Sequence, residues 1–241
     1  MQLEGKNSVF EALQAHKPLE KIITIANPTD SMSSRILRMA REQKVNIQSV
    51  NKNVLDKKSV TKKHQNFIAL TQDFEYCEVE DILKHAQQNN KQPFIVILDG
   101  IQDPHNFGSI IRVCECANID GIIIPKHRSV GVTETVSRTS AGAINHMKIA
   151  RVTNLNNAIE QLKQQNIWVY ALELGGENIY SQNLKGAVAI VVGSEGFGVS
   201  KHTKEICDGV ITLPMQGKVN SLNASVACGV AVFEVNRQRY E

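Results

Sequence analysis

The chain has 241 residues, of which 42% are hydrophobic and 21% are charged. This composition excludes a disordered protein, and the length favours two domains over one. The apolar runs have the length of buried strands rather than of membrane-spanning helices, and the first ten residues lack the apolar stretch of a secretory signal. We therefore expect a globular cytoplasmic protein that does not cross a membrane.

The five cysteines argue against a metal centre. They stand at positions 77, 114, 116, 207 and 228, so their number is odd and no two have the CxxC spacing. Scattered cysteines without an export signal are typical of reduced, mostly buried thiols. We expect neither a zinc site nor any other bound metal.

Positive charge is concentrated in the N-terminal part. Residues 1–91 contain 14 Lys and Arg against 11 Asp and Glu, whereas residues 92–241 contain 13 of each. Between residues 52 and 63 five lysines face a single carboxylate, Asp56. A basic segment of this kind indicates contact with nucleic-acid phosphates, although a solvated lysine-rich surface is the alternative.

The first seventy residues predict a small α/β domain. Helical and strand patterns alternate, with helices at Asn7–Ala15 and Ser31–Gln43 and strands at Lys21–Ala26, Val45–Val50 and Asn66–Thr71. The following stretch is acidic, then forms a short helix at Val79–Gln87, then becomes polar. We therefore expect an N-terminal domain over residues 1–73 and a linker over residues 74–92.

Residues 93–241 predict a second α/β domain with a mostly parallel sheet. Its expected strands are rich in Ile and Val, which indicates burial on both faces: Phe94–Asp99, Gly121–Ile124, Ile167–Leu172, Ala187–Val192 and Gly209–Leu213. The last helix is expected at Leu222–Arg237. We expect its larger apolar residues (Leu222, Val226, Val230 and Phe233, with Gly229) to face the core. Its small residues (Ala224, Ala227, Cys228 and Ala231) are expected to be covered by a second copy of the domain, with burial inside the same domain as the alternative.

Three glycine-bearing loops each follow an expected strand. They span Leu98–Arg112, Val191–Ser200 and Leu213–Ser225. In open α/β sheets, ligands bind beyond the carboxyl ends of the strands, so these loops are the candidate site. None has the GxGxxG or GxxxxGK[ST] pattern, which argues against a dinucleotide or ATP site.

Each polar residue in these loops also has a purely structural interpretation. Asn106 suits the N-cap of a helix at Phe107–Cys116, and Ser221 suits the N-cap of the last helix. Arg112 lies within an apolar helix and is able to pair with a surface carboxylate. Glu195 precedes a helix N-terminus, where a negative charge is favourable in any case. Only the occurrence of all three loops together indicates a functional site.

The three loops resemble the three motifs of the SpoU/TrmH branch of the SPOUT RNA methyltransferases. The matching segments are DPHNFGSIIRVCECANIDGIII, IVVGSEGFGVS and LPMQGKVNSLNASVACGVAVFE. The segments GKNSVFEAL and HQNFIAL also resemble the small RNA-binding domain of that branch, whose fold is similar to ribosomal protein L30e. One departure is Asn66, where these enzymes usually have glycine.

This resemblance implies a fold, a cofactor and a reaction. The C-terminal domain would contain a deep trefoil knot and bind S-adenosyl-L-methionine, and the protein would act as a homodimer. The reaction would be 2′-O-methylation of a ribose in RNA, with a guanosine in the peptidyl-transferase region of 23S rRNA, or of a large-subunit assembly intermediate, as the expected target. A tRNA ribose methyltransferase and an inactive RNA-binding assembly factor are the alternatives.

The resemblance also assigns roles to particular positions. Expected catalytic residues are Asn106, Arg112, Glu195, Ser221 and Asn223. Expected cofactor-binding residues are Leu172, Gly193, Gly196, Leu213, Met215 and Leu222. With the basic segment, the expected RNA-binding residues are Lys57, Lys58, Lys62, Lys63 and His64. Arginine is normally a permanent cation, so Arg112 either deprotonates transiently as the base or stays charged and stabilises the developing oxyanion. Neither route needs a metal.

Overall fold

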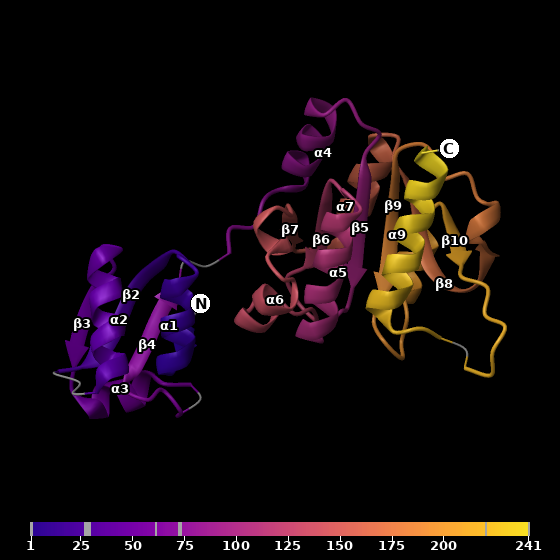
Figure 1. Ribbon diagram of the computed structural model, residues 1–241. Helices are drawn as coiled ribbons and strands as arrows, with labels where there is room; N and C mark the ends of the chain where they lie inside the picture. The colour runs from indigo at the N-terminus through magenta and orange to yellow at the C-terminus, as the bar shows by residue number, and fades with distance from the viewer. Residues whose placement is uncertain (1, 27–29, 61, 72–73, 220, 241) are drawn as a thin grey trace. The chain divides into compact units, whose positions relative to one another are not determined.

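A computed structural model of the chain describes residues 2–26, 30–60, 62–71, 74–219 and 221–240. The chain divides into two compact units, Met1–Glu75 and Tyr76–Glu241 (Figure 1). Within the described ranges no helix is long and apolar enough to cross a membrane.

The first unit is a mixed four-stranded sheet with helices, as the sequence predicts. Its elements are β1 (Gln2–Glu4), α1 (Lys6–Gln14), β2 (Leu19–Ile25), α2 (Ser31–Glu42), β3 (Asn46–Val50), α3 (Lys52–Lys58) and β4 (Phe67–Thr71). The strand order is β1-β4-β2-β3, with only β2 and β3 parallel. The short strand β1 and the helix in the basic segment are additions to the predicted elements.

The two N-terminal segments that carry the family resemblance meet in space. Gly5 donates its backbone N–H to the carbonyl of Phe67 at 3.1 Å, and the N–H of Lys6 donates to Oε1 of Gln65 at 3.1 Å. Lys6 also pairs with Asp30, the N-cap of α2, at 2.5 Å. This pairing, together with the hydrogen bonds from Ser33, holds the pKa of Asp30 well below its usual range.

The second unit contains a six-stranded sheet in which every pairing is parallel. Its elements are α4 (Val79–Gln88), β5 (Phe94–Asp99), α5 (Pro104–Cys116), β6 (Gly121–Pro125), α6 (Glu134–Thr139), η1 (Ala143–Asn145), β7 (Ile149–Val152), α7 (Leu155–Gln164), β8 (Trp168–Asn178), η2 (Ile179–Ser181), β9 (Val188–Gly193), α8 (Lys201–Ile206), β10 (Gly209–Thr212) and α9 (Ala224–Tyr240). The order is β10-β8-β9-β5-β6-β7. The predicted parallel sheet is confirmed, whereas β7 and the last six residues of β8 were not predicted.

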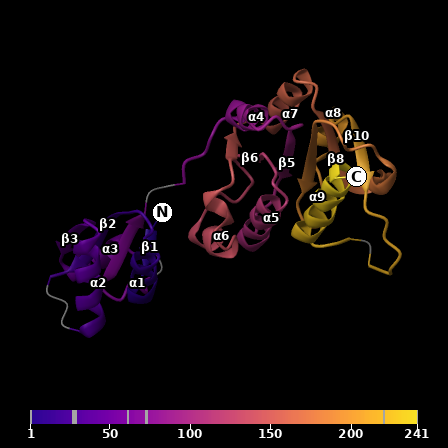
Figure 2. The ribbon, with the colours of Figure 1, turned by 45° about the horizontal axis from the view of Figure 1, so that its top comes forward.

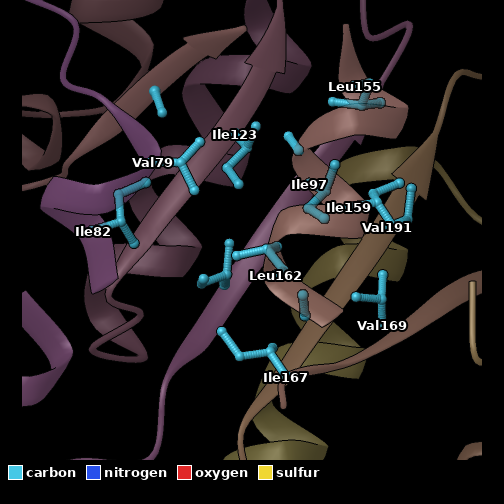
Figure 3. Packing of buried hydrophobic residues seen from close by; sticks show 14 of the residues in the cluster. Val79, Ile82, Ile97, Ile123, Leu155, Ile159, Leu162, Ile167, Val169 and Val191 are labelled. Atoms are coloured by element: carbon cyan, nitrogen blue, oxygen red, sulfur yellow. The ribbon is translucent and has the colours of Figure 1, made fainter. Parts of the chain in front are cut away.

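Helices cover both faces of this sheet. Alternate strand residues, among them Ile97, Ile123 and Val191, pack with α4 and α7 in one cluster (Figure 3). The residues between them point to the opposite face, where α5 and α9 lie side by side (Figure 2). Strands β5 and β9 are therefore buried on both faces, which explains their continuous Ile and Val content.

Helix α4, in the segment expected to be a linker, belongs to the core of the second unit. Val79 and Ile82 are buried in the same cluster as the strands, and Ile82 packs so closely on Gly121 that a Cβ there would overlap it. Cys77 forms an isolated parallel bridge with Ala150 of β7. A fragment of the second unit that begins at residue 93 would therefore lack part of its own core.

We predict that a fragment of residues 76–241 folds and binds S-adenosylmethionine, the cofactor that the family resemblance implies, whereas residues 93–241 alone are strongly destabilised. The shorter fragment loses the buried Val79 and Ile82, each contributing about 1.5–3 kcal/mol. Urea unfolding of both fragments, with cofactor binding by calorimetry, checks this. Equal unfolding midpoints would contradict the role of α4. A folded 76–241 fragment that ignores the cofactor while the full chain binds it would contradict the loop assignment.

Helix α9 packs with the face opposite to the one predicted. Its buried side is made of small and medium residues, including Ala224, Cys228 and Ala231. Its large apolar residues are exposed instead: Leu222 just before the helix by 40%, Val226 by 51%, Val230 by 38% and Phe233 by 51%. The reason is the close approach of α5, whose Val113 contacts Gly229. The prediction that the large residues fill the core was wrong.

The cysteines are all free, and they are less buried than predicted. Only Cys114 and Cys228 are buried, while Cys116 is exposed and the other two are half-buried. Burial raises the pKa of the Cys114 thiol well above its usual value, and the neighbouring Cys228 adds to the rise. These two thiols lie between α5 and α9, where they act as small packing groups.

Candidate active site

The three predicted loops meet at the carboxyl edge of the parallel sheet. Because all six strands run in one direction, the segments after β5, β9 and β10 open at the same edge. There a cavity of about 630 Å³ lies between residues 172–174, 192–198, 212–215 and 221–227. Its volume is in the range that holds a nucleoside-sized ligand.

The cavity brings together most of the residues expected at the site. All six expected cofactor-binding residues line it: Leu172, Gly193, Gly196, Leu213, Met215 and Leu222. Three of the expected catalytic residues line it as well, namely Glu195, Ser221 and Asn223. Asn106 and Arg112 are not among the lining residues, although Asn106 contacts two that are.

Asn106, Glu195 and Asn223 form a closed hydrogen-bonded cluster that joins the three loops. Asn106 Nδ2 donates to Oε1 of Glu195 at 3.0 Å, and Asn223 Nδ2 donates to Oδ1 of Asn106 at 2.8 Å. Asn223 Nδ2 also donates to Oε1 of Glu195. Because an ionised carboxylate only accepts hydrogen bonds, Glu195 fixes which way both amides point. Glu195 therefore sets the relative positions of the first and third loops.

The capping interpretations of Asn106 and Ser221 are wrong. Helix α5 begins earlier than predicted, and its N-cap is Asp103, which accepts from the N–H of His105 at 3.1 Å. Asn106 is thus within the first turn and is 8% exposed. Asn223, not Ser221, precedes α9 and accepts from the N–H groups of Ser225 and Val226. Ser221 is exposed at the rim of the cavity.

Glu195 is bound to a helix N-terminus, but not to the one predicted. Its Oε1 accepts from the N–H of Ala224, the first residue of α9, at 3.3 Å. Helix α8, which follows Glu195 in the sequence, is capped by Ser200 instead. The N-terminus of α9 favours a negative charge at this place, so the carboxylate is stabilised at the point where the three loops meet.

The second loop is a tight turn that requires its glycines. Ser194 and Gly198 exchange two backbone hydrogen bonds, at 2.9 and 3.2 Å. A Cβ on Gly193 would overlap the backbone of Gly198. Gly198 has a φ of +67° and lies against the carboxylate of Glu173, which leaves no room for a side chain.

Glu173 is a cavity residue that sequence reasoning missed. Its Oε2 accepts from the N–H of Val199 at 2.9 Å and lies 3.9 Å from Nζ of Lys204. It therefore holds the second loop from the side of β8. The available signal was its position, directly after the predicted end of a buried strand, but no motif marks it.

Arg112 lies apart from the cavity on the exposed side of α5. Its side chain is exposed, and it forms no ion pair or hydrogen bond with the residues the structure describes. The next residue, Val113, contacts Gly229 of α9. Arg112 is thus on the helix that adjoins the exposed apolar residues of α9, and the surface ion pair considered as its alternative role is absent among the described residues.

The predicted RNA-binding lysines are exposed on the first unit. Lys57 and Lys58 are the last residues of helix α3, and Lys62 and Lys63 follow a few residues later in the chain. Nζ of Lys62 donates to the carbonyl of Asp56 at 2.7 Å. Lys62 is thereby tied to helix α3, next to Lys57 and Lys58.

His64 does not share this exposure. It is 6% exposed, its Nε2 lies 2.7 Å from Oδ1 of Asp56, and its Nδ1 accepts from the N–H of Asn66 at 3.1 Å. Both ring nitrogens are thus used within the domain, so the ring is not on the surface that the four lysines form, and its role as an RNA contact stays a prediction. Asn66 itself has a φ of +67°, a conformation that glycine adopts freely and asparagine tolerates.

The chemistry of the cavity fits S-adenosylmethionine. Leu172, Leu213 and Met215 offer apolar surface for a nucleoside, whereas Glu195 and the open loop at Gly196 offer polar contacts. Within the described ranges no group of three or more His, Cys, Asp or Glu is placed to hold a metal ion.

Comparison with protein families agrees with this site. The family model described as the SpoU rRNA methylase family matches residues 93–233. The chain belongs to this family. A second family model, described as RNA 2′-O ribose methyltransferase substrate binding, matches residues 2–77. The SpoU methylase match covers all three loops, and the second covers the first unit.

Relatives of the SpoU methylase extend over almost the whole chain. YacO of Bacillus subtilis, assigned to the TrmH family of tRNA/rRNA methyltransferases, is 43% identical over 98% of this chain and 94% of its own length. A Staphylococcus aureus protein assigned to the same family is 40% identical over 98% of this chain and 96% of its own length.

Solved structures show the same fold. The SpoU methyltransferase AviRb from Streptomyces viridochromogenes, in complex with AdoMet, has a TM-score of 0.70 at 18% identity, covering 100% of this chain and 91% of its own. An AdoMet-bound rRNA methyltransferase from Sinorhizobium meliloti has a TM-score of 0.65 at 21% identity, covering 98% of this chain and 86% of its own. The family matches and the relatives make the chain an RNA 2′-O-ribose methyltransferase, with the predicted α/β fold and with S-adenosylmethionine as its cofactor.

Proposed function

We propose that this SpoU methylase methylates a guanosine ribose in the peptidyl-transferase region of 23S rRNA, as naked RNA or within a large-subunit assembly intermediate. The observation that carries the proposal is the closed cluster of Asn106, Glu195 and Asn223 beside a cofactor-sized cavity, in a chain that also has an N-terminal substrate-binding domain. The relatives are bacterial, which supports action in the cytoplasm, where ribosomes are assembled.

The cofactor would lie in the cavity among Leu172, Leu213 and Met215, with backbone contacts from Gly193, Gly196 and Leu222. When bound, it supplies an electrophilic methyl group on a sulfonium. The trefoil knot implied by the family resemblance is part of the proposal, and the loops at 193–198 and 213–223 are the segments that it would involve.

In the proposed reaction the ribose 2′-oxygen forms a bond to the methyl carbon as the carbon–sulfur bond breaks. The hydroxyl proton must leave in or near the transition state. Arg112 stays cationic and stabilises the developing negative charge on that oxygen, while the hydroxyl proton passes to water or an RNA phosphate. Asn106 and Glu195 keep the loops in the geometry that aligns hydroxyl and methyl group.

We further propose that Arg112 acts on the cofactor site of a second copy. It is exposed, it does not line the cavity of its own chain, and it lies on the helix next to the exposed stripe of Val226, Val230 and Phe233. A homodimer formed through this stripe would cover apolar surface and bring the arginine toward the partner's cavity.

Two alternative functions remain distinguishable by experiment. A tRNA ribose methyltransferase would use the same cavity. An assembly factor without catalysis would keep the fold, but the cluster of Asn106, Glu195 and Asn223 is intact, which favours an active enzyme. The tRNA ribose methyltransferases of the branch that the chain resembles usually lack an N-terminal substrate-binding domain, so its presence here favours rRNA as the substrate.

The test is a map of ribose 2′-O-methyl groups in rRNA and tRNA from cells with and without the gene. We expect one guanosine of 23S rRNA to lose its methyl group and to regain it on complementation. Loss of a tRNA methyl group instead would replace the rRNA proposal, and no missing methyl group in either RNA would favour the assembly factor.

The basic segment of the first unit should contribute affinity for RNA rather than catalysis. We predict that replacing Lys57, Lys58, Lys62 and Lys63 by glutamine weakens RNA binding and lowers the salt slope of log affinity by about 0.7–0.9 for each phosphate that is no longer neutralised. Affinity for S-adenosylmethionine should not change, because the cavity is in the other unit. Binding titrations at several salt concentrations measure both. An unchanged slope would make this segment an ordinary solvated surface.

A further inference from the structure

A loop after β6 carries three consecutive basic residues that do not line the cofactor cavity. These are Lys126, His127 and Arg128, and no acidic residue follows before Glu134. All three side chains are exposed, and none forms an ion pair with any residue in the described ranges. A short basic run is often only a solvated surface, so its place in the fold and its anchoring decide its meaning.

The loop lies at the same edge of the sheet as the cofactor cavity. In Figure 1 the arrow of β5 points toward the end of the unit where α6 and the first turn of α9 lie. The N–H of Val130 and the Oγ of Ser129 both donate to the carbonyl of Ile101, at 2.9 and 3.2 Å, which ties this loop to the loop after β5. The carbonyl of Arg128 also lies beside Gly100, which in turn adjoins Ser194, the neighbour of Glu195.

The loop is held at both ends. The carbonyl of Lys126 accepts from Nη2 of Arg151 at 3.2 Å, and the guanidinium of Arg151 lies 5.3 Å from the ring centroid of Tyr76. The hydroxyl of Tyr76 accepts from the N–H of Val132 at 2.8 Å. A loop fixed in this way presents its cations with little ordering cost on binding.

The backbone of the loop is bent into an unusual conformation at Arg128. This residue has a φ of +58°, in the left-handed region that residues other than glycine adopt at a cost. The hydrogen bonds at Lys126, Ser129, Val130 and Val132 maintain this bend. Arg128 is thus held in a backbone conformation that glycine or asparagine would adopt at a lower cost.

We propose that this basic loop, residues 126–132, is an RNA contact of the catalytic unit, in which Lys126 and Arg128 bind phosphates of nucleotides next to the target ribose. The inference rests on the proposed function and adds to it the direction in which the RNA strand passes the cavity. A guanidinium matches the oxygens of a phosphate with two parallel hydrogen bonds, and an ammonium binds them as a point charge. Such contacts fix the position of a strand without reading its bases.

The test compares variants of equal charge at the two edges of the sheet. Lys126→Gln with Arg128→Gln removes two charges from the basic loop. Lys91→Gln with Lys185→Gln removes two exposed charges that precede β5 and β9, at the opposite edge. Binding to unmodified 23S rRNA transcribed in vitro is measured at several salt concentrations, together with methyl transfer and with cofactor binding by calorimetry.

We expect the loop variant to bind RNA about tenfold more weakly at moderate salt and to lower the salt slope by about 1–2 units, with unchanged affinity for the cofactor. The control pair should behave as the wild type. Tyr76→Phe, which removes the acceptor for Val132 but no charge, should reduce kcat/KM for RNA a few-fold with the salt slope kept.

Equal slopes for the loop variant and the control pair would overturn the proposal. So would an equal loss of affinity in both, because that would show only the effect of net charge. If the wild type binds this RNA but transfers no methyl group to it, the proposed function fails, while the salt slopes still decide whether the loop contacts RNA.

Discussion

Replacing Arg112 by alanine should lower the rate of methyl transfer about 10²–10³-fold at saturating RNA and cofactor, the range found when one oxyanion-stabilising donor is removed. Binding of S-adenosylmethionine should be unaffected, because Arg112 does not line the cavity of its own chain. Folding should also be unaffected, since the side chain is exposed and has no partner within the described residues. Single-turnover transfer of a labelled methyl group, with calorimetry of cofactor binding, measures these effects.

Arg112→Lys separates the two roles considered for this residue. Lysine keeps the positive charge but lacks the planar, paired N–H donors of the guanidinium. The electrostatic role therefore predicts partial activity in Arg112→Lys, with a transfer rate that does not gain a pH dependence near neutrality. A general base predicts a rate that rises with pH in the lysine variant, because an ammonium releases its proton more easily than a guanidinium. The matched control is Arg41→Ala, which removes an exposed arginine from the first unit, whereas the cavity is in the second. Wild-type activity in Arg112→Ala would remove this residue from the mechanism.

The sequence predicted the architecture well because the strands of the second unit are buried on both faces. Their continuous Ile and Val content indicates strands of a parallel sheet covered on both faces. Because parallel strands all end at the same edge of a sheet, the three loops that follow them meet there. Strand β7 was missed because only Ile149 and Ala150 of its four residues are buried. A short, half-buried strand has too little pattern to be recognised.

Hydrogen-bond partners that are distant in the sequence could not be predicted. Asn106 has the composition of a cap, yet its amide bonds to Glu195, which is 89 residues away. Spacing says nothing about such a contact. The predicted orientation of α9 was wrong for a related reason. A stripe of large apolar residues is able to pack against the protein's own core or against a partner chain, and the sequence pattern is the same in both cases. In the structure the small residues Ala224, Cys228 and Ala231 face inward, on the side where α5 packs.

The second large effect is expected when charges are placed on the exposed apolar side of α9. If the chain forms the proposed homodimer, we predict that Val226→Glu with Phe233→Glu converts it into a folded monomer that still binds S-adenosylmethionine but transfers methyl groups at least about 10²-fold more slowly. Both side chains are 51% exposed, so the charges do not enter the core of the unit. Trp168→Glu, at an apolar residue that is 59% exposed at the start of β8, on the sheet edge opposite the cavity, should leave both mass and activity unchanged. Light scattering and transfer assays check the three proteins.

Mixing two inactive variants tests whether Arg112 of one chain acts at the cofactor cavity of the other chain in the proposed dimer. One variant is Arg112→Ala, and the other is Gly196→Val, which places a β-branched residue at a φ of +84° in the cavity wall. If the arginine serves the partner's cavity, each hybrid dimer contains one complete site, and an equal mixture recovers about a quarter of wild-type activity. If the arginine serves its own cavity, every site in the mixture lacks one component. No recovery, in a mixture shown to exchange subunits, would place Arg112 and the cofactor in the same chain.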